Sequence, residues 1–413
     1  MTDQNVVIVG AGVSGLIAAI ELEKKGYSPI ILEASASVGG RVKTDREDEY
    51  RFDHGFQVLL TAYPEAQHYL DYNALKLKKF QPGAIIHSNQ GDYLIADPLR
   101  QPSALLAMIS SPVGTVGDKW KMWRLTQKLK KKTITDIFAG PSISTLAYLE
   151  DFGFSARILN NFFRPFFGGI FLEDELQTSS RMFQFIFKMF SEGHAAIPEE
   201  GMQAIPDQLA KQLKKTEFRF NTTVASISEN VIETSSGSLE YDRVIVTVPP
   251  HALLPEYKQK ATAFQGTVNS YFAIPKVKKT GYIGLRPIGK RLINNLCVLS
   301  DVSLLYSSDK TSLLSVSTIG SPILIGEEFT QALIAELTAI LGFEAADIKF
   351  LKHYNIKKAL PILKSPQMRI SEQEVKYNHK IYLAGDYLLG GSLNAAMISG
   401  RESVQIMLKG TDE

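Results

Sequence analysis

The first residues of the chain are apolar at four successive positions, 6–9, which read Val-Val-Ile-Val. A short β-branched run of this kind predicts a strand that is buried on both faces, as in a parallel sheet. Apolar residues then recur at helical spacing over positions 16–22, and Gly26 follows two lysines as a helix stop. The pattern predicts a strand, a turn and a helix at the start of the chain.

The predicted turn is glycine-rich, with the sequence Gly-Ala-Gly-Val-Ser-Gly at positions 10–15. Gly10 suits a tight turn, Gly12 lets the backbone approach a pyrophosphate, and Gly15 lets the helix pack closely on the strand. The helix N-terminus offers N–H groups and partial positive charge to an anion. We therefore expect a dinucleotide pyrophosphate at Gly10, Gly12, Val13, Ser14 and Gly15.

A second predicted strand, at positions 29–32, ends at Glu33. A carboxylate at this point can accept hydrogen bonds from ribose hydroxyls, and it disfavours a 2′-phosphate. Three spaced glycines alone are a weak signal, but strand, helix and acid at the correct spacing make a chance match improbable. These residues predict a dinucleotide site without separating FAD from NAD.

Two motifs follow: Val-Gly-Gly-Arg at positions 38–41 and Phe-Asp-His-Gly-Phe-Gln-Val at positions 52–58. Here the sequence resembles the superfamily of FAD-dependent amine oxidases, phytoene desaturases and protoporphyrinogen oxidases, and the resemblance extends through most of the chain. It implies that Arg41 pairs with the pyrophosphate, a role that suits a planar guanidinium; a surface arginine is the alternative. The other cofactor contacts that it implies here are Ala34, Gly40, Gly55, Phe56, Gln57 and Val58.

A second glycine-rich region lies near the end of the chain. Positions 381–386 read as a buried strand that ends in Asp386, and residues from Leu393 onward follow helical spacing. The resemblance implies that Gly385 and Asp386 contact the ribityl and phosphate region of FAD, and that this helix points at the flavin N1–C2=O. The contacts implied at its start are Ser392, Leu393 and Asn394. This second site favours FAD over NAD.

The resemblance also implies that Val224 meets the adenine, although a valine in a strand is more often part of a core. Two positions depart from the common pattern, since Ser35 replaces a basic residue and Ala395 replaces a glycine. No cysteine lies between Gly385 and Asn394, so we expect FAD to be bound non-covalently. His54 is either a structural residue or a covalent attachment point.

The cofactor motifs fall in separated parts of the chain, so the cofactor domain must be discontinuous. We expect an α/β fold, with a Rossmann-type FAD-binding domain from residues 1–78, 198–254 and 356–413. An α+β substrate-binding domain would comprise residues 79–197 and 255–355. This domain consists of two inserts into the cofactor domain. The first insert, from about residue 80 to 195, shows helix-like periodicity and many phenylalanines. The second insert, from about residue 255 to 355, alternates β-prone stretches with one helix at positions 327–341.

Two features of the first insert allow two interpretations each. The phenylalanines between positions 152 and 190 either pack a core or line a pocket for a large apolar substrate. Residues 119–132 interleave seven basic residues with tryptophan, methionine and leucine. This segment is either an exposed basic helix or an amphipathic helix that makes peripheral contact with the inner face of a membrane.

Composition excludes several classes of protein. Forty-five Lys and Arg against forty-three Asp and Glu give a net charge of +2 across 413 residues, so no global field attracts nucleic acid. A lone cysteine, Cys297, cannot form an internal disulfide, and we expect no metal site. We expect a cytoplasmic protein of unknown oligomeric state, without a signal peptide or membrane span.

The leading functional hypothesis is an FAD-dependent oxidoreductase that takes a hydride from a mostly apolar small molecule onto flavin N5, by C–C desaturation or C–N oxidation. The alternatives are an amine oxidase that produces hydrogen peroxide, a non-redox flavin-dependent isomerase, and a flavin-binding protein without turnover. No catalytic residue can be assigned from the sequence. Phe56 and Tyr387 are candidates to face the flavin ring or the substrate, although each can equally be structural.

Overall fold

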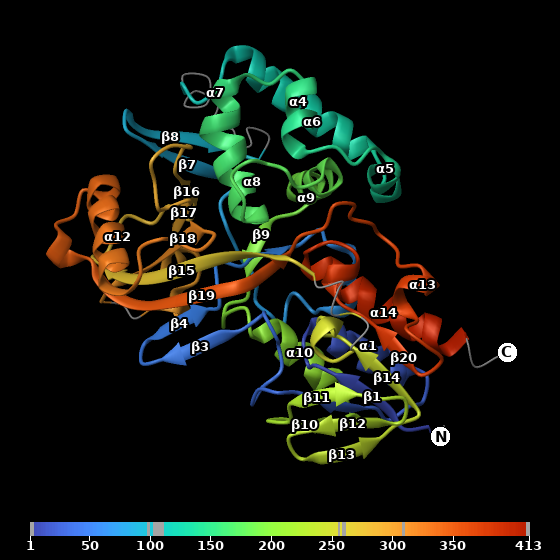
Figure 1. Cartoon of the computed structure of the whole chain (residues 1–413). Coiled ribbons are helices and arrows are strands. Elements are labelled where there is room, and N and C mark those ends of the chain that lie inside the picture. Colours follow the sequence, from blue (N-terminus) through green and yellow to red (C-terminus); the bar gives the residue numbers. More distant parts are fainter. Residues whose placement is uncertain are drawn as a thin grey trace.

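The computed structural model describes residues 4–96, 100–101, 111–254, 257, 262–307 and 310–409. Two sheets organise the molecule (Figure 1). A parallel sheet lies at the end that carries both termini, and helices α4 to α9 lie at the opposite end, beyond a larger sheet. The structure contains both helices and β-strands, arranged in layers around two sheets, and this confirms the predicted α/β class.

The parallel sheet has five strands drawn from distant parts of the chain. Their order is β10 (Glu217–Arg219), β2 (Ile30–Leu32), β1 (Val6–Val9), β14 (Arg243–Val246) and β20 (Ile381–Leu383). All neighbouring pairs are parallel, and the central strand β1 is buried at every residue. The predicted opening strand is therefore confirmed, as is the helix behind it, α1 (Val13–Lys24).

Helix α1 packs directly against the C-terminal helix α14 (Leu393–Lys409). Helix α10 (Ala204–Gln212) also contacts α1. The approach is close because glycine stands at Gly400: a Cβ there would lie 2.3 Å from Ser14 O. The Ser14 hydroxyl also donates a hydrogen bond to Ala396 O, at 2.9 Å. The first and last helices of the chain thus form one unit against the parallel sheet.

The larger sheet has seven strands, and only its β16–β7 pair is parallel. Helix α12 (Gly326–Leu341), close to the predicted helix at 327–341, covers a core on one face of it. The strand order is β19 (Lys349–Pro361), β15 (Phe264–Ile274), β18 (Ser312–Ile319), β17 (Asn295–Val298), β16 (Ile283–Leu285), β7 (Gly83–Ser88) and β8 (Gly91–Ala96).

Strands β7 and β8 differ from the expected helical character of residues 80–195. They form a hairpin around Asn89 and Gln90, and Gly91 takes a φ of +119° that suits glycine. The apolar pair Ile85 and Ile86 does not by itself indicate a helix, because short apolar runs fit helices and strands alike. Pairing with β16, some 200 residues later, decides in favour of a strand.

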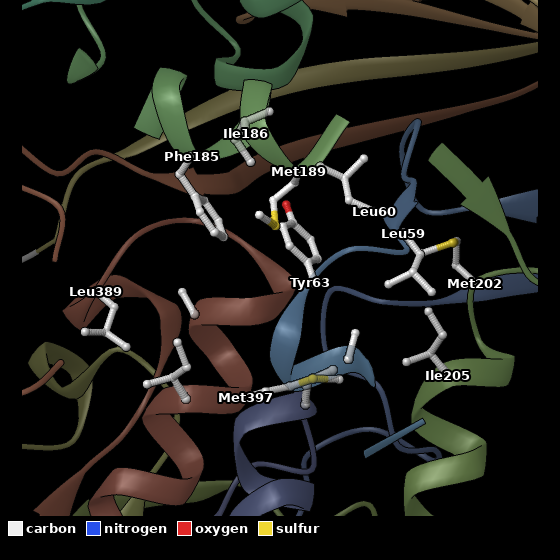
Figure 2. Packing of buried hydrophobic residues seen from close by; sticks show 14 of the residues in the cluster. Leu59, Leu60, Tyr63, Phe185, Ile186, Met189, Met202, Ile205, Leu389 and Met397 are labelled. Carbon is white, nitrogen blue, oxygen red and sulfur yellow. The ribbon is translucent and has the colours of Figure 1, made fainter. Parts of the chain in front are cut away.

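The helical layer consists mainly of α4 (Val116–Lys131), α8 (Arg164–Phe171) and α9 (Ser180–Glu192). Phe163, Phe167 and Phe183 are fully buried in it, with the Phe167 and Phe183 rings 4.7 Å apart. Figure 2 shows how Phe185, Ile186 and Met189 of α9 extend this core toward Tyr63 and helix α14. One continuous core therefore joins the helical layer to the parallel-sheet side.

Short elements complete the fold. Small sheets are formed by β11 (Val224–Ile227), β12 (Val231–Thr234) and β13 (Gly237–Glu240), by β3 (Thr44–Glu47) and β4 (Tyr50–Asp53), and by β5 (Leu59–Leu60), β9 (Ala195–Ile197) and β6 (Lys78–Lys79). Short helical segments are α2 (Pro64–Tyr69), α5 (Ile134–Ala139), α6 (Thr145–Asp151), α7 (Ala156–Ile158), η2 (Leu159–Phe163), η3 (Pro250–Ala252), α11 (Leu299–Val302), η5 (Leu304–Tyr306), η6 (Ala345–Asp347), α13 (Glu372–Val375) and η7 (Asp386–Leu388).

Candidate cofactor and substrate site

The glycine turn at residues 10–15 joins β1 to α1 at the carboxyl edge of the parallel sheet. Gly10 has a φ of +102°, and a Cβ at Gly15 would lie 2.0 Å from Gly10 O, so both positions require glycine. A Cβ at Gly12 would meet nothing within 4 Å among the described residues. No described side chain caps α1, which begins at Val13, so its first N–H groups are available to an anion.

Glu33 follows β2 and holds the glycine turn in place. One carboxylate oxygen accepts the Ala11 N–H at 2.8 Å, and the other accepts the N–H and hydroxyl of Ser35 at 2.8 and 2.7 Å. Two carboxylate oxygens provide about four acceptor sites, so the group keeps capacity for a ribose hydroxyl. Ala34, between these two residues, is exposed.

Val224 lies close to the same region. The N–H of Thr222 donates to Glu33 O at 2.9 Å, which anchors the start of β11 beside the end of β2. The Val224 side chain is partly buried against the apolar cluster that contains Val9 and Leu32. The structure thus brings together the residues expected around the adenosine, and it gives Val224 a packing role as well.

The second glycine pair lies against the first. The Gly39 N–H donates to Ala11 O at 2.9 Å. Gly40 has a φ of +60°, and a Cβ there would lie 3.3 Å from Gly12 Cα. Two glycine segments that were separate in sequence therefore form one backbone-lined surface.

Arg41 and Asp386, predicted as cofactor contacts from opposite ends of the chain, meet in an ion pair. Arg41 Nη2 lies 2.5 Å from Asp386 Oδ1, and Nη1 donates to Ala359 O at 3.0 Å. The Asp386 side chain is 8% exposed and that of Arg41 is 44% exposed. Because a guanidinium has five N–H donors, Arg41 can hold Asp386 and still bind an anion.

The segment at residues 55–58 lies beside Arg41. The Gln57 amide donates to Arg41 O at 2.8 Å and to His54 O at 2.9 Å. Gly55, with a φ of +98°, is buried, and the Val58 side chain packs against the main core. The Phe56 ring meets the Phe80 ring edge to face at 6.1 Å.

The C-terminal residues predicted to contact the cofactor have clear local partners. Gly385 has a φ of +146° and donates its N–H to the Ser399 hydroxyl at 2.6 Å. The Ser392 hydroxyl accepts the Ala395 N–H at 3.1 Å, next to Leu393, the partly buried first residue of α14. Asn394 Oδ1 accepts the Glu65 N–H at 3.1 Å and so binds the start of α2.

Tyr387 is buried directly behind Gly385, where a Cβ would lie 2.3 Å from the tyrosine ring. Its hydroxyl has no hydrogen-bond partner among the described residues. Burial, with the nearby Tyr257 and Asp386, raises the pKa of Tyr387, so the phenol stays protonated. An unpaired buried hydroxyl beside this backbone is available to a bound group.

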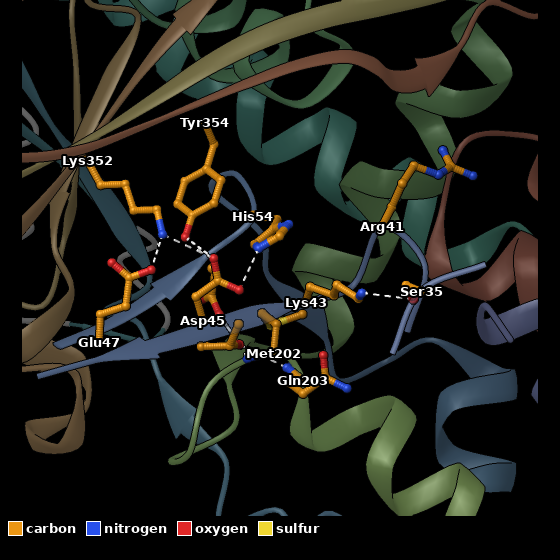
Figure 3. A network of polar contacts seen from close by, with 12 residues as sticks. Ser35, Arg41, Lys43, Asp45, Glu47, His54, Met202, Gln203, Lys352 and Tyr354 are labelled. Carbon is orange, nitrogen blue, oxygen red and sulfur yellow. Dashed lines mark hydrogen bonds and ion pairs between the residues drawn. The ribbon is translucent and has the colours of Figure 1, made fainter. Parts of the chain in front are cut away.

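Lys43 is a residue near this site that sequence reasoning missed. Its ammonium group lies 3.2 Å from the Ser35 hydroxyl, as Figure 3 shows. A positive charge therefore lies beside Ser35, the position at which the common pattern has a basic residue. Only the fold reveals that Lys43 lies beside Ser35, because the two residues are eight positions apart in the sequence.

A polar network on β3 and β19 supports the site from the side of the large sheet (Figure 3). Asp45 accepts the Tyr354 hydroxyl at 2.6 Å and lies 3.3 Å from the Lys352 ammonium and 3.0 Å from His54 Nε2. Partial burial opposes ionisation, but hydrogen bonds from Tyr354, His54 and Lys352 and the electrostatic effect of His54 lower the pKa of Asp45. His54 is thus held within a structural network.

Asp53 is a fully buried carboxyl group at the junction of several segments. It accepts hydrogen bonds from the Thr44 hydroxyl at 2.5 Å, the Tyr306 hydroxyl at 2.6 Å and the Met202 N–H at 3.0 Å. Its backbone carbonyl accepts the Tyr271 hydroxyl at 2.8 Å. Burial raises the pKa of Asp53, although these hydrogen bonds act in the opposite direction.

A mostly apolar cavity of about 280 Å³ lies between the helical layer and the β7–β8 hairpin. It begins one aromatic ring away from the segment at residues 55–58, because Phe80 both lines the cavity and contacts Phe56. Among the described residues that line it, none is Asp or Glu. The phenylalanines between positions 152 and 190 thus fulfil both interpretations. Some form core alone, Phe162, Phe166, Phe187 and Phe190 line the cavity, and Phe167 belongs to the core and also lines the cavity.

His194 also lines this cavity, and sequence reasoning did not single it out. Partial burial and the charges of Lys79 and Arg100 lower the pKa of His194. The imidazole is therefore neutral near pH 7 and can accept a proton. The backbone carbonyl of His194 accepts the Thr61 N–H at 2.9 Å, which fixes the strand beneath the cavity.

Comparison with known proteins identifies the family. Residues 13–408 match the family described as flavin containing amine oxidoreductase. The chain belongs to this family. The resemblance inferred from sequence is confirmed, and the protein is an oxidoreductase that uses a flavin and acts on a small molecule.

Individual relatives agree with this assignment. Protoporphyrinogen oxidase 2 of Arabidopsis thaliana is 23% identical, over 99% of this chain and 94% of its own length. The L-amino acid oxidase of Cerastes cerastes is 61% identical over 46 residues, only 11% of this chain and 9% of its own.

Solved structures show the same fold. An oxidoreductase from Methanosarcina mazei superposes with a TM-score of 0.76 at 14% identity, covering 97% of this chain and 100% of its own. Cyclohexylamine oxidase from Brevibacterium oxydans gives a TM-score of 0.69 at 15% identity, with full coverage of both chains.

Two features are absent from the part of the chain that the structure describes. No three His, Cys, Asp or Glu side chains gather there in an arrangement that could bind a metal ion. None of the helices in these residues combines the length and apolar character that a membrane span requires.

The raised pKa of Asp53 predicts a pH-dependent stability difference between the natural chain and Asp53→Asn. The folded state favours the protonated carboxyl, so the natural chain loses stability as pH rises above the ordinary carboxyl range, whereas the amide does not titrate. The stability advantage of the natural chain over the variant should therefore shrink as pH rises above the ordinary carboxyl range. Urea unfolding followed by circular dichroism measures this difference. Asp151→Asn, at an exposed position, is the control; an equal trend in both variants would contradict the prediction.

Proposed function

We propose that this protein is an FAD-dependent oxidoreductase that takes a hydride from a neutral or anionic, mostly apolar substrate. The proposal rests on the positions of the glycine turn and the apolar cavity relative to each other. An open glycine turn connects through Arg41, Gln57 and Phe56 to an apolar cavity that has no acidic residue in its described lining. A cofactor site and a substrate site therefore adjoin.

The residues present fit a dinucleotide of the size of FAD. The space in front of Gly12 and the uncapped start of α1 suit a pyrophosphate, with Arg41 as a further donor. Glu33 would hold the ribose, with Lys43 nearby and Val224 against the adenine. The flavin would extend toward residues 55–58 and the start of α14.

We propose that binding is non-covalent. The one cysteine of the chain, Cys297, is buried in β17 with its thiol 3.7 Å from Tyr282 O. His54 is engaged with Asp45 and Tyr354. The proposed cofactor domain remains residues 1–78, 198–254 and 356–413, although β19 runs across residue 356 and thereby links it to the large sheet.

The cavity decides which substrates are favoured. Its described lining includes Arg100, Lys119 and His194 but no carboxylate, so a protonated amine would meet no opposite charge there. A neutral apolar molecule would lose little on leaving water. Dehydrogenation of an apolar substrate is therefore favoured over amine oxidation.

In the proposed reaction, FAD supplies when bound a two-electron acceptor for a substrate hydride. The phenylalanines of the cavity would orient the substrate and exclude water. As the hydride leaves one substrate atom, a proton leaves the neighbouring atom. The neutral imidazole of His194 is the group of this chain that we propose to accept that proton.

Amine oxidation is the second candidate. One relative is an L-amino acid oxidase and one solved structure of the same fold is a cyclohexylamine oxidase. The likeness to the first is confined to 46 residues, and the likeness to the second shows the fold alone. An unprotonated amine would fit the apolar cavity, so this candidate predicts activity that rises with pH.

Gly12→Val tests the pyrophosphate position. A side chain at residue 12 would point into open space in the protein, so the fold should survive while the space for a phosphate is lost. We expect FAD retention to fall by at least about tenfold, the effect of losing one or two charge-assisted hydrogen bonds. Flavin absorption after purification and after added FAD measures retention.

The matched control is Gly117→Val in α4, another glycine at which a Cβ has room. It should retain FAD as the natural chain does. Normal FAD retention by Gly12→Val would disprove the phosphate assignment.

Anaerobic reduction of the bound flavin tests the substrate class. We expect neutral apolar compounds with a dehydrogenable C–C bond to bleach the flavin at least about tenfold faster than putrescine or cyclohexylamine at neutral pH, since each unpaired buried charge costs several kcal/mol. Faster bleaching by the amines, with hydrogen peroxide on admission of air, would establish amine oxidation instead.

We also propose that helix α4 contacts an anionic membrane surface. Val116, Trp120 and Trp123 are 77%, 56% and 54% exposed, an unusual density of large apolar side chains. Basic residues accompany them on the same helix, and the Arg124 guanidinium lies over the Trp120 ring at 4.7 Å. Trp123 also lines the apolar cavity, so such contact would bring the cavity close to lipid.

Vesicle binding tests this surface. Trp120→Ser/Trp123→Ser should lower partition onto phosphatidylglycerol vesicles by about tenfold or more, since each buried CH₂ contributes ~0.8 kcal/mol. Ile323→Ser/Ile325→Ser, which also removes two exposed apolar side chains, should change partition little. Equal partition of both double variants, or no partition of the natural chain, would refute the proposal.

A further inference from the structure

A second cavity, of about 480 Å³, lies next to the apolar cavity and has the opposite character. We call it the basic cavity. Four cationic side chains line it, those of Arg157, Arg286, Lys290 and Arg291, and none of its described lining residues is Asp or Glu. The proposed function makes no use of this space.

Two of these charges are already compensated within the protein. Arg286 lies 3.3 Å from Glu336, and Arg291 lies 2.7 Å from Asp174 with only 5% of its side chain exposed. In the part of the chain that the structure describes, no ion pair or side-chain hydrogen bond involves Arg157 or Lys290, and both are exposed. The basic cavity therefore has a surplus of two positive charges.

The two cavities share part of one wall. Val113, which is 3% exposed, lines both. On α7, Arg157 lines the basic cavity and the next residue, Ile158, lines the apolar one. On η2, Asn161 lines the basic cavity and Phe162 the apolar one.

The β7–β8 hairpin likewise contributes to both cavities. Ile86 and Tyr93 line the basic cavity, and Gly83 and Ile95 line the apolar one. Three separate elements thus contribute residues to both cavities over one to three positions. A ligand that reached from one cavity to the other would have mostly apolar side chains around one part and cationic side chains beside the other.

We infer that the substrate is an amphipathic carboxylate, with an apolar body in the phenylalanine-lined cavity and its carboxylate between Arg157 and Lys290. The inference rests on the proposed function, because it takes the apolar cavity as the substrate site. A carboxylate accepts charge-assisted hydrogen bonds from guanidinium and ammonium groups, and it would neutralise the surplus charge. The basic cavity thereby orients the substrate and favours an anionic molecule over a neutral one, while it disfavours a cationic one.

Two related dyes test the inference without turnover. Anilinonaphthalene sulfonate carries an anionic group on an apolar ring system, and N-phenylnaphthylamine is its uncharged counterpart. We expect the natural holoenzyme to bind the sulfonate more tightly, and each dye to displace the other from one site. Arg157→Gln/Lys290→Gln should weaken binding of the sulfonate by about tenfold and leave that of the neutral dye unchanged.

Lys25→Gln/Lys211→Gln is the control, with the same loss of charge at exposed positions on the parallel-sheet side. It should bind both dyes as the natural chain does. Unchanged sulfonate affinity in Arg157→Gln/Lys290→Gln, or simultaneous binding of both dyes, would overturn the inference. A chain that binds the dyes as expected but oxidises no apolar substrate would contradict the proposed function and leave the linked cavities established.

Discussion

The fold depends on backbone segments that approach one another where no side chain intervenes. Gly15 lets α1 lie on the turn at Gly10, Gly400 lets α14 lie on Ser14, and Gly40 lies against Gly12. A Cβ at residue 15 or 400 would lie within 2.3 Å of a carbonyl oxygen, a distance that no repacking of side chains relieves. These contacts fix the start of the first helix against the glycine turn and against the middle of the last helix.

Charged and polar groups then join these glycine contacts to the rest of the molecule. The Arg41–Asp386 pair ties the glycine segments to the C-terminal region, and Asp53 collects hydrogen bonds from three other segments. Each group is buried or half-buried, so loss of one partner would leave the other unpaired in surroundings of low polarity. The open face at Gly12 and the apolar cavity beside Phe80 are thereby held in fixed relation.

The sequence predicted what local pattern and motif spacing determine. The strand and helix around Gly10, the position of Glu33 after β2 and the helix that begins at Leu393 follow from periodicity and turn chemistry, and the structure has them. It did not predict the β7–β16 pairing, which depends on contacts across some 200 residues. Lys43 beside Ser35, Asp53 among its donors and the division of the phenylalanines between core and cavity depend on side-chain directions that only the assembled fold sets.

The central claim is that the protein holds FAD without a covalent bond. The most direct measurement is the flavin content of the purified protein before and after denaturation. We predict a flavin spectrum in the folded protein and release of intact FAD, one per chain, into the supernatant when the protein is precipitated with acid. Flavin that stays with the precipitated chain would contradict non-covalent binding. Absence of flavin, together with no uptake of added FAD, would contradict the account as a whole.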